Sequence, residues 1–289
     1  MTYVILDLEW NGAYCDKLGG YFNEIIEIGA VRLSEDKRIE ERFDAYIRPV
    51  VSCKLTRLVT NLTGITDDQV RHGVSFGQAM EDLHRFIGED AVVMTWSNTD
   101  LTVLMENCRY FYHNERIPFL SSYVDLQSYA QTRLGLGTAQ QVALGKLAEL
   151  LQLNSEEMEL HHAIDDSVLA AAIFQRVFEP LSFSKAVLSV GDEFYRRLTF
   201  KPTFIREIDD PLIRRSDLRF SCECCKRNLK RIGEWQFQHR FFTAAFRCAA
   251  CDAEYIGRVQ AKKKYDGVEI KKRLIRKTTE KTKETGGMI

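Results

Sequence analysis

Two carboxylates interrupt an apolar segment near the start of the chain. Asp7 and Glu9 stand within VILDLEW (residues 4–10), and alternate residues of a β-strand project from the same face. The two acids are therefore expected side by side, where they repel each other and lose hydration unless a cation stabilises them. Hard divalent ions such as Mg²⁺ prefer carboxylate oxygens. The alternative is an edge strand with two solvated acids.

Further titratable residues occur at two later points. Asp100 follows a short apolar strand at an expected helix start, and Asp165 and Asp166 open an apolar helix. Two histidines, His161 and His162, come directly before that helix. Acids in a first helical turn interact favourably with the helix dipole, so capping is the alternative role for Asp165 and Asp166 individually.

The elements that must position these residues follow an alternating pattern. Hydrophobic periodicity predicts strands over 3–9, 25–33, 39–48 and 92–94, and helices over 75–87, from about residue 100, over 140–152 and over 165–178. Strands followed by alternating helices predict an α/β layer fold with a mixed sheet. From 181 to 220 the pattern weakens, which favours a partly helical connector.

The net charge of −1 conceals a strong asymmetry along the chain. Residues 1–200 carry 18 basic and 29 acidic residues, whereas residues 201–289 carry 22 basic and 12 acidic ones. Two units with different roles are expected, and the basic one could bind a polyanion. No apolar run reaches the ~20 residues that a membrane span needs. Because the first residues lack signal-peptide features, we expect a cytoplasmic protein.

Five of the eight cysteines fall within 30 residues of one another. Cys222 and Cys225 form one Cys-x-x-Cys pair, and Cys248 and Cys251 form a second pair after 22 intervening residues. This is the four-thiolate spacing of a zinc ribbon, in which Zn²⁺ is structural. Cys224 could replace a ligand of the first pair, and a redox dithiol is the alternative. A basic tail is expected after the ribbon, so the predicted units are 1–180, 181–220, 221–257 and 258–289.

The ordered acids resemble the DEDDh branch of the 3′–5′ exonucleases, in the RNase T/DnaQ-like superfamily. The matching motifs are Asp-x-Glu at Asp7 and Glu9, the mid-chain Asp100, and the His-x-Ala-x-x-Asp motif from His161 to Asp166. The resemblance covers about residues 1–180. It implies an RNase H-like fold with a mixed five-stranded sheet flanked by helices, to which the small zinc ribbon is added.

The resemblance also implies a reaction, which is hydrolysis of phosphodiester bonds at 3′ ends of single-stranded nucleic acid with two Mg²⁺ or Mn²⁺ ions. By resemblance, Asp7 would bridge both ions, Glu9 and Asp166 would hold the water-bearing ion, Asp100 would support the second ion, and His161 would accept the proton of the attacking water. Trp10 and Leu8 would contact the terminal nucleotide. We give His162 and Asp165 no catalytic role, and expect a surface histidine and a solvated or capping acid.

Substrate choice and the role of the ribbon stay open at this point. The second motif, WSNTD at residues 96–100, differs from the His-Asn-x-x-Phe-Asp of polymerase proofreaders. It is more similar to the KapD-like exonucleases and their eukaryotic relatives that trim RNA ends, which slightly favours RNA over DNA. The alternatives are a catalytically silent regulatory protein and a DNA proofreading exonuclease. The aromatic and basic ribbon could contact nucleic acid or a protein partner.

Overall fold

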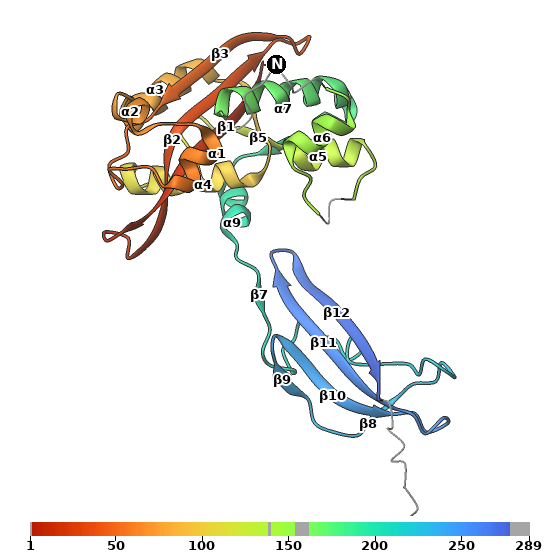
Figure 1. Cartoon of the computed structure of the whole chain (residues 1–289). Coiled ribbons are helices and arrows are strands. Elements are labelled where there is room, and N and C mark those ends of the chain that lie inside the picture. Colours follow the sequence, from red (N-terminus) through yellow and green to blue (C-terminus); the bar gives the residue numbers. More distant parts are fainter. Residues whose placement is uncertain (1, 138–139, 154–161, 278–289) are drawn as a thin grey trace, which may run out of the picture. The chain divides into compact units, whose positions relative to one another are not determined.

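The chain divides into two compact units, Met1–Thr199 and Phe200–Ile289 (Figure 1). The computed structural model describes residues 2–137, 140–153 and 162–277. Each unit has a sheet and a hydrophobic core of its own. In the part of the chain that is described, no helix is long and apolar enough to span a membrane.

A mixed sheet of six strands forms the centre of the first unit. Its order is β3-β2-β1-β4-β5-β6, and the strands are β1 (Thr2–Cys15), β2 (Gly20–Leu33), β3 (Ile39–Tyr46), β4 (Ala91–Thr95), β5 (Ser122–Asp125) and β6 (Leu188–Ser189). β1 is antiparallel to β2 and parallel to β4. The predicted mixed sheet is confirmed, but it has six strands instead of five. The additional strand, β6, has only two residues, which is too short for a recognisable pattern.

The first two strands form a hairpin that is longer than the sequence predicted. Their pairing continues from Tyr3 opposite Leu33 to Cys15 opposite Gly20, with a register shift between Glu9 and Trp10. We expected these strands over 3–9 and 25–33. Beyond the shift, cross-strand backbone pairing continues although the regular apolar alternation ends, so periodicity underestimates the strand length.

Helices cover both faces of this sheet (Figure 1). The helices of the first unit are α1 (Arg57–Thr63), α2 (Asp67–Arg71), α3 (Phe76–Ile87), α4 (Asn98–Tyr112), α5 (Leu126–Arg133), α6 (Leu144–Leu150), α7 (Ala163–Val177), α8 (Pro180–Ala186) and α9 (Asp192–Thr199). α3 and α4 pack on the face that carries Leu6 and Leu8 of β1. α5 to α8 pack on the opposite face, which carries Tyr3 and Ile5. The acids at positions 7 and 9 share this second face, because strand residues alternate.

The second unit is a six-stranded β-structure. Its main order is β12-β11-β10-β8, with β7 beside β11 and β9 beside β10. The strands are β7 (Thr203–Phe204), β8 (Lys230–Arg231), β9 (Gln236–Gln238), β10 (Phe241–Arg247), β11 (Glu254–Lys264) and β12 (Gly267–Arg276). Buried side chains of β10 and β11 pack against Phe220 and Cys222 from the segment that precedes β8.

Two of the predicted boundaries are therefore wrong. Residues 258–276, which we expected in a basic tail, continue β11 and form β12 within the second sheet. The expected connector, 181–220, is divided between the units at Thr199 and Phe200. In β11, the buried Val259 and Ala261 alternate with half-buried polar residues. One apolar face suffices to hold such a strand on a core, even though its other face is basic.

Candidate active site and metal centres

Carboxylates from two elements meet on one face of the first sheet. Oxygen atoms of Asp7, Glu9 and Asp166 all lie within 4.8 Å of one another, and each of these side chains is partly exposed. Asp7 and Glu9 come from β1, and Asp166 comes from the start of α7. The predicted strand geometry therefore brings the first pair together, and the third acid joins it. A group of carboxylate oxygens of this kind is the donor set that Mg²⁺ and Mn²⁺ prefer.

Asp100 lies beside this group but is not one of the three convergent acids. It occupies the first turn of α4, directly after the fully buried β4, and is itself buried. The backbones of Asp100, Leu8 and Ser97 lie close enough to its carboxyl group to lower the pKa of that group. Leu8 belongs to β1, so Asp100 lies next to the strand that carries the Asp-x-Glu pair.

The electrostatics of the cluster favour a bound cation when the acids are ionised. Burial raises the pKa of Asp7 well above its usual range, and the nearby charges of Asp100, Asp166 and Glu9 raise it further. Burial also raises the pKa of Glu9 to about 8, with Asp166 as the next cause. Burial raises the pKa of Asp100 to about 7, although backbone N–H groups oppose that shift. Because four ionised acids here would be uncompensated at neutral pH, a divalent ion fits this donor set.

A fifth acid, Glu27 of β2, positions the helix that carries Asp166. Glu27 is fully buried, and its carboxylate accepts a hydrogen bond from the Ala163 N–H (3.0 Å) and lies 3.3 Å from His162 Nδ1. α7 has no side-chain cap from its own N-cap residue, so Glu27 satisfies one of its free N–H groups and favours its dipole. Ser167 also donates to the Gly29 carbonyl (3.0 Å).

Gly29 explains how α7 can approach the strands so closely. A Cβ atom at this position would lie 2.1 Å from the Ala163 carbonyl carbon and the Ile164 nitrogen. Gly29 is paired with Asp7 in the sheet. Only glycine therefore allows the first turn of α7, with Asp166, to lie against the strand pair that carries the other acids.

The remaining predicted site residues lie as follows. His161 falls outside the described residues. His162 is half-buried against Glu27, so the expectation of a surface histidine is wrong. Trp10 is partly buried and packs at the edge of the core formed with α3 and α4. Leu8 is only 2% exposed within that core, so its side chain is not available to a nucleotide, which corrects the expected contact.

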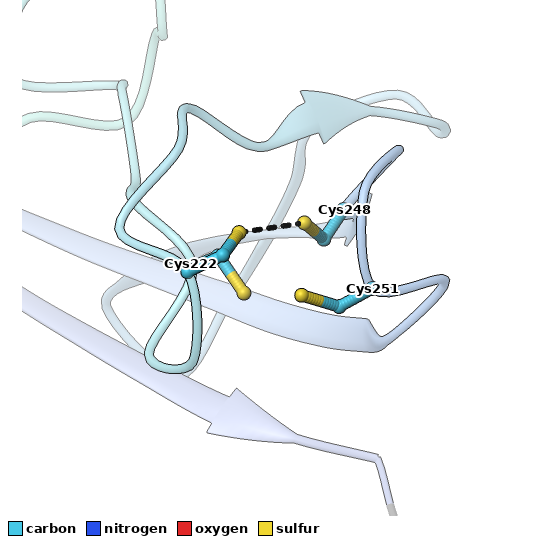
Figure 2. Close-up of side chains that lie close together, drawn as sticks. Cys222, Cys248 and Cys251 are labelled. Atoms are coloured by element: carbon cyan, nitrogen blue, oxygen red, sulfur yellow. Dashed lines mark hydrogen bonds between the residues drawn. The ribbon is translucent and has the colours of Figure 1, made fainter.

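The four predicted zinc ligands also converge. The sulfur atoms of Cys222, Cys225, Cys248 and Cys251 lie within 4.8 Å of one another, and the Cys225 and Cys248 sulfurs are 3.5 Å apart. Figure 2 shows the labelled side chains pointing toward one another from two separate loops. Tetrahedral Zn–S bonds of about 2.3 Å place sulfurs about 3.8 Å apart, so this geometry fits Zn²⁺. Cys224 is exposed and does not belong to the group.

Tyr255 lies next to the four cysteines and contacts one of them. Its hydroxyl lies 3.3 Å from the Cys222 sulfur. This hydrogen bond, followed by those from the Cys225 and Cys224 backbones, lowers the pKa of Cys222 to about 6. A lowered thiol pKa favours the thiolate that binds a metal ion.

Sequence reasoning missed the positioning role of Glu27 and the role of Tyr255. A signal for Glu27 was present, because an acid stands within the apolar run IIEIGAV (residues 25–31). A buried acid of this kind needs hydrogen-bond donors. Tyr255 gave no comparable signal, since a tyrosine in a strand is ordinary.

Comparisons with known proteins agree with the geometry of the first unit. Residues 4–174 match the family model of the RNase T exonucleases. The chain belongs to this exonuclease family. The probable 3′–5′ exonuclease KapD of Bacillus subtilis (strain 168) is 31% identical over 181 residues, which cover 61% of this chain and 84% of KapD. The first unit is thus an exonuclease domain, a hydrolase acting on nucleic acid 3′ ends, as the ordered motifs predicted.

More distant relatives share parts of this domain. A PolC-type DNA polymerase III of Ureaplasma parvum serovar 3 is 24% identical over 174 residues, which cover 60% of this chain but only 11% of the polymerase. Among solved structures, the nuclease domain of 3′hExo, a DEDDh family member bound to rAMP, has a TM-score of 0.54 at 23% identity and covers 66% of this chain and 96% of that domain. Cell-death related nuclease 4 (CRN-4) has a TM-score of 0.52 at 23% identity, with 61% and 62% covered. These likenesses support the RNase H-like fold of the exonuclease domain.

Proposed function

We propose that this protein removes nucleotides from the 3′ ends of single-stranded nucleic acid by a two-metal mechanism in which His161 is the general base. The observation that carries this proposal is the convergence of the Asp7, Glu9 and Asp166 oxygens within 4.8 Å of one another. Like charges are kept together here at a cost in stability, which is reasonable where divalent ions bind. Asp100, beside them, completes the set of acids.

Each residue of this chain has a defined task in that reaction. Asp7, Glu9, Asp100 and Asp166 would hold the ions. When bound, two Mg²⁺ or Mn²⁺ ions would supply charge stabilisation and a lowered water pKa. His161 would take the proton of the attacking water, a task that suits a group titrating near neutral pH. Glu27 and Gly29 would keep Asp166 in register with the Asp-x-Glu strand, through their contacts with α7.

RNA is the favoured substrate. The WSNTD motif supports RNA, and so does a structural neighbour of the exonuclease domain, a 3′-exonuclease that recognises the histone mRNA stem-loop (22% identity, TM-score 0.55). The likeness to PolC-type DNA polymerases supports DNA as the alternative substrate, and a proofreading exonuclease is the alternative function. A silent regulatory protein is a weaker alternative, because such a protein gains nothing from four acids whose proximity destabilises it.

The test is an assay of the purified full chain on 5′-labelled single-stranded RNA and DNA of equal sequence. We expect a ladder of products shortened from the 3′ end, no activity after chelation, and recovery with Mg²⁺ or Mn²⁺. RNA should be degraded faster than DNA. Equal or faster cleavage of DNA would favour the proofreading alternative, and no cleavage with either ion would favour the silent protein.

Substitution of two neighbouring histidines tests which residue is the general base. His161→Ala should reduce kcat by at least ~10²-fold, the usual contribution of general-base catalysis. His162→Ala should leave more activity than His161→Ala, because His162 contacts Glu27 and not the reacting atoms in this proposal. Wild-type activity should rise with pH through the range of histidine titration. A greater loss in His162→Ala would show that the base has been assigned to the wrong histidine.

A further inference from the structure

The second unit presents one covered and one open face of its sheet. On the covered face, Tyr255, Gly257 and Val259 are buried beneath residues of segment 205–229. The intervening residues of β11 point to the other side and remain partly exposed. Strand register places aromatic and basic side chains on this open face, among them those of Phe204, Phe241, Arg258, Lys262, Lys271 and Arg273.

Positive charge on the open face is incompletely compensated. Arg258 stands directly opposite Arg273 on the neighbouring strand, an arrangement of like charges that destabilises a sheet. Within the described residues, neither arginine forms a salt bridge, and Lys262 forms none either. Glu269 stands directly opposite Lys262, but its carboxylate is engaged by Lys264 (3.0 Å) and Lys271 (3.3 Å) instead. The face therefore has free cations for an anionic ligand.

Aromatic rings are interleaved with these cations. The Arg258 guanidinium lies 5.6 Å from the centre of the Phe241 ring. The Phe204 ring is approached by the Arg240 guanidinium at 5.1 Å and by the Lys262 ammonium at 5.6 Å. Both phenylalanines are only partly buried. Rings of this kind can stack on nucleic acid bases while adjacent cations contact phosphates.

We propose that the open face of the second unit binds the backbone and bases of single-stranded nucleic acid. The charge of this part of the chain favours a polyanion, since residues 201–289 carry 22 basic and 12 acidic residues. Unpaired arginines complement phosphates, and the two rings supply the stacking surface that an acidic protein would not require. The proposal goes beyond the proposed catalytic function. It rests on that function only in taking the bound strand to be the strand that the exonuclease domain cleaves.

The test measures binding of labelled ~20-nucleotide single-stranded RNA and DNA to the full chain over a series of salt concentrations. An Asp7→Ala background prevents cleavage of the probe. Arg258→Gln/Arg273→Gln should flatten the slope of log affinity against log salt by about 1.4, or about 0.7 for each lost phosphate contact on a single strand. Phe241→Ala should weaken binding about tenfold, the effect of one stacked base, with a smaller change in slope.

Matched controls separate this face from general charge effects. Arg215→Gln/Arg227→Gln removes the same charge from exposed positions in the segment that covers the other face, and should leave the slope nearly unchanged. The open-face double variant should melt at the same or a higher temperature than its parent, because its cross-strand repulsion is relieved. A loss of binding without a fall in melting temperature would therefore not be due to unfolding.

Three results would overturn the proposal. The first is a salt slope that is unchanged in the open-face double variant, and the second is an equal change of slope in both double variants. The third is that the open-face double variant loses binding to an acidic peptide but still binds the nucleic acid strands. The last result would assign the face to a protein partner. Cleavage of a dinucleotide by the otherwise wild-type enzyme reports on the exonuclease domain alone. Its absence, with strand binding intact, would contradict the proposed catalytic function and leave the binding face standing.

Discussion

Replacing Asp7 with asparagine should make the metal-free protein more stable while it removes activity. The substitution keeps the shape of the side chain but removes one charge from the cluster. Burial and neighbouring acids raise the pKa of Asp7 in the folded state. A carboxyl group with a raised folded-state pKa binds more protons in the native than in the unfolded chain, so the free energy of unfolding falls as pH rises through that interval.

The magnitude can be worked from Glu9 in the same cluster. Its pKa of about 8 compares with an ordinary value of 4.5. Since each pKa unit corresponds to about 1.4 kcal/mol, ionising one such group in the metal-free fold costs at most about 5 kcal/mol. For Asp7→Asn we expect a gain of about 2 to 5 kcal/mol in the free energy of unfolding at pH 9. The gain should shrink toward zero near pH 4.

Urea unfolding followed by tryptophan fluorescence measures this difference. Trp10 and Trp96 belong to the first unit and Trp235 belongs to the second, so a Trp235→Phe background restricts the signal to the exonuclease domain. Added Mg²⁺ should stabilise the parent protein and have a smaller effect on Asp7→Asn, because a ligand is missing. Asp165→Asn is the matched control, since Asp165 lies outside the convergent group.

Two outcomes would refute this reasoning. A metal-free Asp7→Asn protein that is less stable than its parent at pH 9 would show that the acids are compensated within the fold. Hydrolysis within tenfold of the wild-type rate, where at least ~10³-fold loss is expected for a shared metal ligand, would remove Asp7 from the site.

Two further predictions concern the elements that support the sites. Gly29→Ala should destabilise the exonuclease domain by about 1 to 3 kcal/mol in urea unfolding, because its new Cβ overlaps the α7 backbone at 2.1 Å; unchanged stability would contradict the close approach of α7. Cys248→Ser should lose one equivalent of zinc by metal analysis, whereas Cys224→Ser should retain it, since Cys224 lies outside the thiolate group. Equal zinc contents in the two variants would contradict the assignment of ligands.

The parts of the site that the sequence predicted depend on local geometry. Asp7 and Glu9 converge because alternate strand residues share a face, and this rule holds whatever surrounds the strand. The spacing of the two Cys-x-x-Cys pairs is similarly local, since each pair lies within one loop. Ordered acids also identify the family, so the α/β fold of the exonuclease domain could be predicted before any contact was known.

The errors arise where tertiary contacts decide. The side chain of Leu8 is buried because α3 and α4 cover its face of β1, and the strand alone does not show which face is covered. Residues 258–276 have many lysines and arginines, yet they form strands because β11 pairs with β10 and β12. Composition predicted a basic tail here, but the apolar residues of one face are enough to hold these strands on the core.

The two units share one physical feature, with opposite sign. In the exonuclease domain, Asp7 and Glu9 are held with Asp166 on one face at a cost that burial increases. In the second unit, Arg258 and Arg273 face each other across neighbouring strands without a salt bridge among the described residues. Folding alone favours neither arrangement, because like charges repel in both. In the functions proposed above, a divalent cation would relieve the first repulsion and a phosphate backbone would relieve the second. Each unit would then take from its ligand the opposite charge that its own fold does not supply.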